Sequence, residues 1–145
     1  MRLAPSCSGN ILLVTEVTLS FADDTVRAVG VSHYQDALTR ICPRSEGERT
    51  RCRVRAGLVP EPGNPHDPNA VMVRIGDDLV GYLSRGDAER YGPAVRLLAD
   101  HGRHLVCDAV VGGRGGDAGT TNLGVFLSLP GPVEAELEAQ TLVRA

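Results

Sequence analysis

Apolar residues recur at every second position in several segments of the chain, which is typical of β-strands. Six segments show this pattern or a short apolar run bounded by turn residues: 26–34, 49–59, 71–75, 79–83, 103–113 and 120–132. Gly76, Asp77 and Asp78 separate the third segment from the fourth and predict a tight hairpin turn. The glycine-rich stretch 112–121 is expected to be a hairpin loop, because no helical pattern follows it.

After the hairpin the pattern changes to that of a helix. Ser84 and Asp87 have the spacing of a capping box, in which each side chain satisfies a free backbone N–H. Gly92 and Pro93 predict a division into two helical pieces, since proline suits the first position of a helix. Gly102 suits the residue just past a helix end.

This order of elements predicts a mainly β fold. We expect a small OB-like or SH3-like antiparallel β-barrel of about six strands, with a one- or two-piece α-helix inserted after the fourth strand. Residues 1–25 would be an N-terminal extension with room for one extra strand, 26–130 the barrel domain, and 131–145 a C-terminal tail of helical composition.

Composition narrows the possible chemistry. The 145 residues fit one domain, and 42% of them are hydrophobic. The net charge of -3 means that any site for a polyanion must be a local patch. All 15 basic residues are arginine, which excludes a Walker A loop and a lysine Schiff base. No apolar run approaches the ~20 residues that span a bilayer, so we expect a cytoplasmic protein.

Four cysteines stand far apart, at positions 7, 42, 52 and 107. They form no CxxC pair, and their spacing matches no common zinc site. In a cytoplasmic chain such cysteines are expected to be small apolar core residues. The sequence therefore predicts no metal site and no cofactor.

Three arginines alternate with small residues in one expected strand. Arg51, Arg53 and Arg55 would share one face, because successive strand residues point to opposite sides. This row is either a solvated face or a basic track for an anionic ligand.

The stretch EPGNPHDPNA, Glu61 to Ala70, separates two expected strands. Its three prolines fix their own φ angles and restrict the residues before them. Its asparagines and aspartate suit tight bends. The result should be a rigid loop, whose polar side chains either satisfy its own backbone or hold a ligand.

The motif EPGNPHDPNAVMV, followed by GYLSR, resembles the HIRAN domain family. That family has a pattern like E/D-P-x-N-P-Y-D-x-N-A-I-x-V, then G-H/Y-L-x-R/K, and begins with a strand like V-x-G-x-x-Y-Y. VGVSHY (Val29 to Tyr34) is similar to this start, so the resemblance covers about Val26 to Pro130. The chain looks like the short bacterial proteins in which HIRAN is almost the whole chain.

The resemblance implies an OB-like barrel that binds the free 3′ end of single-stranded DNA, in DNA repair or replication-fork processing. Asp67 would accept a hydrogen bond from the 3′-OH, and Asn64 would help to fix the terminal nucleotide. Tyr82 and Arg85 would contact the terminal phosphate. Implied partners are the DNA end and a helicase, nuclease or other repair protein, with no membrane.

Two positions depart from the family pattern. His66 stands where the family has a loop tyrosine, and His33, preceded by Ser32 instead of a basic residue, stands where it has a strand aromatic. Histidine can still stack on a base, but its ring is smaller. On a strand, Tyr34 would face away from His33. Arg51, Arg53 or Arg55 could extend the site as a basic track.

Two other functions remain open. The negative net charge and the two tyrosine-to-histidine changes also suit a regulatory module that binds a protein instead of DNA. A metal-dependent nuclease or hydrolase could use His33, His66 and Asp67 as metal ligands or as a general acid–base set. No catalytic motif is present, so we expect no enzyme and assign no catalytic residue.

Overall fold

The computed structural model describes residues 15–20, 23–43, 49–114 and 123–144. Cys7 and most of the expected glycine-rich loop lie outside these ranges. The elements in chain order are β1 (Thr15–Thr18), β2 (Asp24–Arg27), the 3₁₀-helix η1 (Val31–Tyr34), α1 (Gln35–Ile41), β3 (Arg49–Pro60), β4 (Val71–Ile75), β5 (Asp78–Tyr82), α2 (Arg85–Asp100), β6 (Arg103–Arg114), β7 (Gly124–Leu129) and α3 (Pro132–Arg144).

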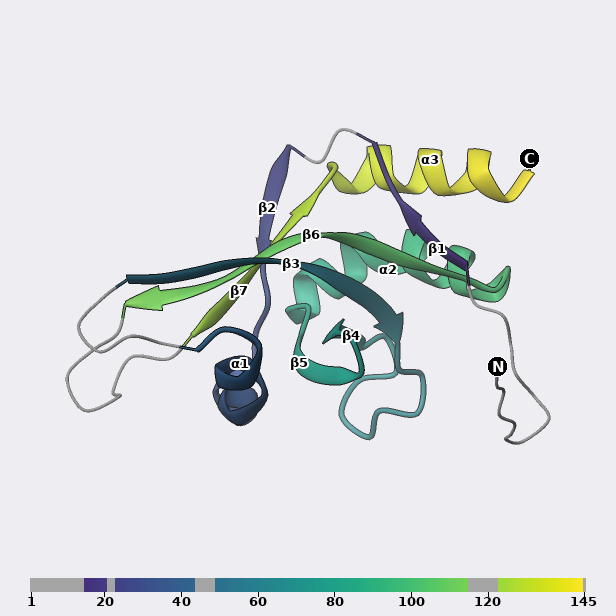
Figure 1. Ribbon diagram of the computed structural model, residues 1–145. Coiled ribbons are helices and arrows are strands. Elements are labelled where there is room, and N and C mark those ends of the chain that lie inside the picture. The colour runs from purple at the N-terminus through teal and green to yellow at the C-terminus, as the bar shows by residue number, and fades with distance from the viewer. Residues whose placement is uncertain (1–14, 21–22, 44–48, 115–122, 145) are drawn as a thin grey trace, which may run out of the picture.

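The strands form one sheet in the order β2-β7-β6-β3-β4-β5 (Figure 1). All neighbours on this path are antiparallel. The two ends of the sheet meet beyond β2: the Val29 N–H donates to the Tyr82 carbonyl at 2.7 Å, and the Tyr82 N–H donates back at 2.9 Å. This closes the sheet into a small barrel and confirms the predicted fold class, with α2 inserted after the hairpin.

β1 departs from the expected antiparallel pattern. It pairs with β6 in parallel, Val17 opposite Leu105. At the other end of the chain, α3 packs against α2 and buries Ala135 and Ala139. The Glu138 carboxylate accepts hydrogen bonds from Ser20, which joins α3 to the segment after β1.

Apolar side chains from the inner face of the strands fill the barrel. Leu58, Val73, Leu105 and Leu127 are fully or almost fully buried. α2 covers this core with Val95 and with the other buried members of its inner face. Within the described ranges, no helix is long and apolar enough to cross a membrane.

The expected strand over 26–34 is wrong beyond its first residues. β2 ends at Arg27, and Gly30 has a φ of 73°, a left-handed conformation that turns the chain into η1. Gln35 then fixes the turn, because its amide donates to the carbonyls of Val31 and Leu123 at 2.9 and 3.0 Å. Gly30 adopts the left-handed conformation without steric cost, and Gln35 bridges two segments of the chain. Together these two residues determine the structure here more strongly than the alternating pattern does.

The expected division of the long helix is also wrong, because α2 is continuous through Pro93. The capping prediction holds in part: the Ser84 hydroxyl accepts a hydrogen bond from the Asp87 N–H at 3.1 Å. Gly92 has no Cβ to clash with the Pro93 ring, and the surrounding residues Tyr91 and Val95 are buried. Burial of this face compensates for the hydrogen bond that proline removes.

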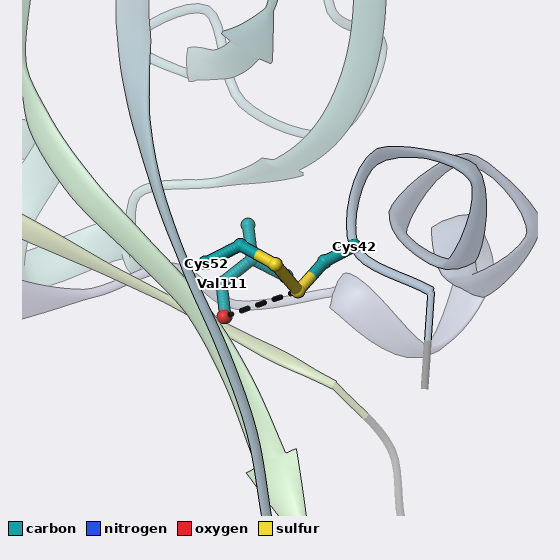
Figure 2. The surroundings of a disulfide bond; sticks show 3 residues. All are labelled: Cys42, Cys52 and Val111. Atoms are coloured by element: carbon teal, nitrogen blue, oxygen red, sulfur yellow. Dashed lines mark hydrogen bonds between the residues drawn. A yellow bond between two sulfur atoms is a disulfide. The ribbon is translucent and has the colours of Figure 1, made fainter. Parts of the chain in front are cut away.

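The expectation of separate core cysteines is wrong for two of them. Cys42 and Cys52 form a disulfide that joins the end of α1 to β3 (Figure 2). The Cys42 sulfur lies 3.7 Å from the Val111 carbonyl oxygen; it carries no proton in the disulfide, so this is a contact and not a hydrogen bond. Their separation of ten residues carried no pairing signal, whereas the fold brings their Cα atoms to 5.9 Å. Cys107 is a free, buried cysteine as predicted.

Candidate nucleic-acid interface

The loop between β3 and β4, residues 61–70, is held by its own side chains. Asn64 Oδ1 accepts hydrogen bonds from the backbone N–H groups of His66 and Asp67, at 2.8 and 3.0 Å. Asp67 Oδ1 accepts one from the Asn69 N–H at 2.9 Å. In a loop with three prolines, the remaining backbone N–H groups cannot pair in a regular strand ladder, and these Asx turns supply acceptors for them. The 61–70 loop is therefore shaped before any ligand arrives, and in Figure 1 it extends from the end of β3 beside β4 and β5.

Glu61 connects this loop to β5. Its Oε1 accepts a hydrogen bond from Asn64 Nδ2 at 2.7 Å and another from the Tyr82 hydroxyl at 2.9 Å. Burial, followed by the hydrogen bond and the charge of Glu61, raises the pKa of Tyr82 to about 12. Tyr82 therefore keeps its proton at neutral pH and directs it at Glu61.

Asp67 keeps one oxygen for another partner. Its Oδ2 lies 3.9 Å from Arg85 Nε, close enough for attraction but too far for a hydrogen bond. The Arg85 side chain is 74% exposed, whereas that of Asp67 is 21% exposed. A half-buried hydrogen-bond acceptor thus stands beside an exposed cation at the beginning of α2.

Aromatic and imidazole rings of η1 lie on the β5 side of the site. η1 packs against β5, and Tyr34 contributes, after burial and Glu61, to the raised pKa of Tyr82. The His33 ring meets the Tyr34 ring edge-to-face, with 6.4 Å between centroids and an interplanar angle of 78°. Because this segment is a 3₁₀-helix and not a strand, Tyr34 does not face away from the site as the strand pattern implied.

The structure brings most of the expected site residues together, in two groups. Asn64, Asp67 and Arg85 are linked through the 61–70 loop, and Tyr82 joins them through Glu61. Ser32 and His33 are exposed on η1, which packs against β5, and His66 is exposed on the 61–70 loop. The sequence analysis did not select Glu61 or Tyr34, although the first residue of the loop motif and the last tyrosine of VGVSHY were visible signals.

The arginine row lies elsewhere on the barrel. Arg51, Arg53 and Arg55 are exposed along β3, and Arg55 donates to Asp108 at 2.8 Å. Arg55 is five residues before Pro60, or about 17 Å along an extended strand, so the row is not part of the 61–70 loop. Among the described residues, no group of three or more His, Cys, Asp or Glu side chains could hold a metal, and His33, His66 and Asp67 do not form one.

Two of the expected contacts with a nucleotide are changed by these hydrogen bonds. Asn64 has both Oδ1 and one amide hydrogen engaged within the loop. Tyr82 donates its single hydroxyl proton to Glu61, so it has no proton left to donate to an ionised phosphate, which can only accept. Both residues therefore position the loop, and Asp67 Oδ2 and Arg85 are left to meet a ligand.

Comparisons with known proteins give one solved structure. No protein-family model matches the chain, and no curated protein shows significant similarity to it. The crystal structure of the HIRAN domain of human HLTF is similar, with a TM-score of 0.34 and 17% sequence identity. The match covers 82% of this chain and 86% of that chain.

Proposed function

We propose that the 61–70 loop binds the 3′ end of single-stranded DNA. The observation that supports this proposal most strongly is the pair formed by Asp67 Oδ2 and Arg85, an open acceptor beside an exposed cation 3.9 Å away. An ionised carboxylate can only accept hydrogen bonds, so its ligand must bring a donor. A terminal nucleotide brings a hydroxyl donor and a phosphate in one molecule.

Each half of this pair suits one part of the nucleotide. Asp67 accepts a hydrogen bond from the 3′-OH, and the Arg85 guanidinium binds the phosphate with two parallel N–H groups. The other oxygen of Asp67 stays on the Asn69 N–H, which fixes the direction of the carboxylate. The role of the loop is thus to hold one acceptor oxygen in place.

Rings at the rim supply stacking surfaces for the terminal base. His33 and His66 are both exposed, the first on η1 and the second on the 61–70 loop. Tyr34 supports His33 from the edge. Base stacking contributes about 1–3 kcal/mol per base, and the smaller imidazole rings place this site toward the lower end of that range.

The motif resemblance to the HIRAN family supports the same ligand and suggests a place in DNA repair or replication-fork processing. In that setting the chain would act beside a helicase, a nuclease or another repair protein. The net charge of -3 limits attraction of DNA to local clusters of arginine, which favours recognition of an end over binding along a duplex.

Fluorescence anisotropy with 5′-labelled single strands tests the proposal. We expect a 3′-OH strand to bind about tenfold or more tightly than the same strand with a 3′-phosphate, because a hydrogen bond to a charged group contributes about 1.5–3 kcal/mol. Asp67→Ala should remove this difference. Asp100→Ala is the matched control, since Asp100 is exposed at the far end of α2, about 22 Å from its first residue.

Equal affinity of the wild-type protein for the two ends would overturn the proposal. A difference that survives in Asp67→Ala would assign the recognition to other residues.

A further inference from the structure

A second surface with the chemistry of a nucleic-acid site lies on the outer face of β2, β7, β6 and β3. The strand register places Arg53 opposite Val110, Val110 opposite Phe126, and Phe126 opposite Arg27. Opposed residues of antiparallel strands share a face, so these four side chains form one row across the sheet. We call this surface, together with Arg51 in the next row, the Phe126 face.

The Phe126 face is hollowed. A shallow cavity of about 580 Å³ is lined by Thr25, Thr50, Arg51, Val110, Gly112, Gly113, Phe126 and Ser128. An adjoining cavity of about 340 Å³ shares Arg51, Val110 and Ser128 with it and continues to Arg53 and to Asp108, the partner of Arg55. The two hollows together form one continuous depression across the strands.

Glycines make the floor of this depression flat. A Cβ atom on Gly124 would lie 3.2 Å from Cε2 and Cζ of Phe126, so the outer edge of the ring reaches over Gly124. Gly112 is opposite Gly124 on β6 and also leaves the sheet surface bare. An aromatic ring lying on an open sheet is the kind of surface on which nucleic-acid bases stack.

The charge around the ring is positive. Arg27, Arg51 and Arg53 are exposed, and none of them forms an ion pair with a carboxylate among the described residues. Arg55, by contrast, is paired with Asp108. The Arg27 guanidinium carbon lies 5.9 Å from the Phe126 ring centroid, at the outer limit of cation–π contact, so it is not tightly stacked.

The outer surface is continuous from this face to the 61–70 loop. Arg27 and Val29 are two residues apart, both exposed, and Val29 pairs with Tyr82 across the seam that closes the barrel. Tyr82 in turn donates to Glu61 of the loop. The path from Phe126 to Tyr82 consists of two cross-strand steps and one two-residue step along the chain. Its length is roughly 17 Å, which a few nucleotides of single strand can span.

We propose that the Phe126 face binds internal nucleotides of a single-stranded nucleic acid, with one base stacked on Phe126 and phosphates at Arg51 and Arg53. The proposal rests on the proposed function for the direction of the strand, whose 3′ end lies in the 61–70 loop. A flat glycine floor with one ring suits a planar base, whereas an extended peptide would need pockets for its alternate side chains.

Oligonucleotides of two lengths test this inference. A 5′-labelled dinucleotide with a 3′-OH is too short to reach from the 61–70 loop to the Phe126 face, whereas a dodecamer covers both. We expect the dodecamer to bind more tightly to the wild-type protein. Phe126→Leu should weaken dodecamer binding about 5- to 150-fold, the loss expected from one stacked base of about 1–3 kcal/mol, and leave dinucleotide binding unchanged.

The arginines are tested by salt dependence. Arg51→Gln combined with Arg53→Gln should lower the slope of log K against log salt for the dodecamer by about 1.4, because each phosphate contact on a single strand contributes about 0.7. Arg90→Gln is the matched control: Arg90 is an exposed arginine of α2 that pairs with Asp87. Circular dichroism and thermal melting confirm that each variant is folded.

The outcomes separate the two proposals. Dodecamer affinity unchanged in Phe126→Leu and in the double arginine variant overturns the inference, as does the absence of dodecamer binding at micromolar protein. If the wild-type protein does not distinguish 3′-OH from 3′-phosphate ends, but Phe126→Leu still weakens dodecamer binding, the end-recognition proposal fails and the Phe126 face stands.

Discussion

At the residue scale, Glu61 is the link between the loop and the barrel. Its Oε1 holds Asn64 at 2.7 Å and Tyr82 at 2.9 Å, while Asn64 holds the backbone at His66 and Asp67. A carboxylate that accepts two hydrogen bonds through one oxygen makes the loop position depend on β5. Glu61, Asn64 and Tyr82 thus place Asp67, the residue proposed to meet the ligand, without contacting the ligand themselves.

The pKa of Tyr82 reports on this link. Glu61→Gln removes the negative charge, so the pKa of Tyr82 should fall from about 12 toward its usual value of 10.0. Absorbance at 295 nm, taken as the difference from Tyr82→Phe, measures the tyrosinate formed. Tyr91, whose pKa burial also raises to about 12, is the internal control and should not change. Identical titration curves in Glu61→Gln and wild type would contradict the link.

The sign of the effect on stability follows. The folded-state pKa of Tyr82 is raised, so the folded protein holds this proton more tightly than the unfolded chain does. The resulting stability is fully present below about pH 10 and is lost as pH rises through about 12. In Tyr82→Phe this part of the alkaline pH dependence should be absent.

At the element scale, the hairpin of β4 and β5 and the N-terminus of α2 could be predicted because their signals are local. Gly76, with a φ of 60°, makes the turn, and Ser84 caps the helix. η1 could not be predicted, since its position depends on Gln35 bonds to Leu123, 88 residues away. Strand alternation is a weaker signal than a left-handed glycine followed by such a tertiary contact.

α1 depends on the disulfide in the same non-local way. Cys42 ends α1 and is fully buried, and its bond to Cys52 holds the helix against β3. η1 and its His33 and Tyr34 directly precede α1. The disulfide therefore fixes one side of the candidate site from a distance.

Reduction of this bond should destabilise the protein. A disulfide that closes a loop of this size contributes about 2–3 kcal/mol, so dithiothreitol should lower the Tm by roughly 5–10 °C. Differential scanning calorimetry measures the change. The Tm of Cys52→Ala should be lower than that of the wild type and should not change when dithiothreitol is added. A wild-type Tm that does not respond to dithiothreitol would rule out a stabilising bond.

At the scale of the whole molecule, the candidate site depends on closure of the barrel. The seam between Val29 and Tyr82 joins the chain after β2 to β5 and places η1 against β5, whose Tyr82 bonds to Glu61 of the 61–70 loop. The order of the strands along the chain could be predicted from the sequence, but the seam could not, because it consists of backbone bonds to a residue outside any regular strand. Gly81 permits it: a Cβ there would lie 2.9 Å from the Val29 carbonyl oxygen.

Gly81→Ala should open this seam. The new methyl group would press on the Val29 backbone, and such crowding costs about 1–3 kcal/mol in the free energy of unfolding. Binding of 3′-OH strands should weaken as well, since η1 moves away from the loop. Gly57→Ala in β3 is the control, because a Cβ there would meet only Val106 Cγ1 at 3.8 Å. Urea denaturation that finds both variants equally stable would contradict this account of closure.

The affinity difference between a single strand ending in 3′-OH and the same strand ending in 3′-H is the most direct test of the central claim. Only one hydroxyl changes, so the difference isolates the hydrogen bond proposed for Asp67 Oδ2. We predict about tenfold tighter binding of the 3′-OH strand to the wild-type protein and equal binding of the two strands to Asp67→Ala. Equal binding of both strands to the wild-type protein would contradict recognition of the 3′ end.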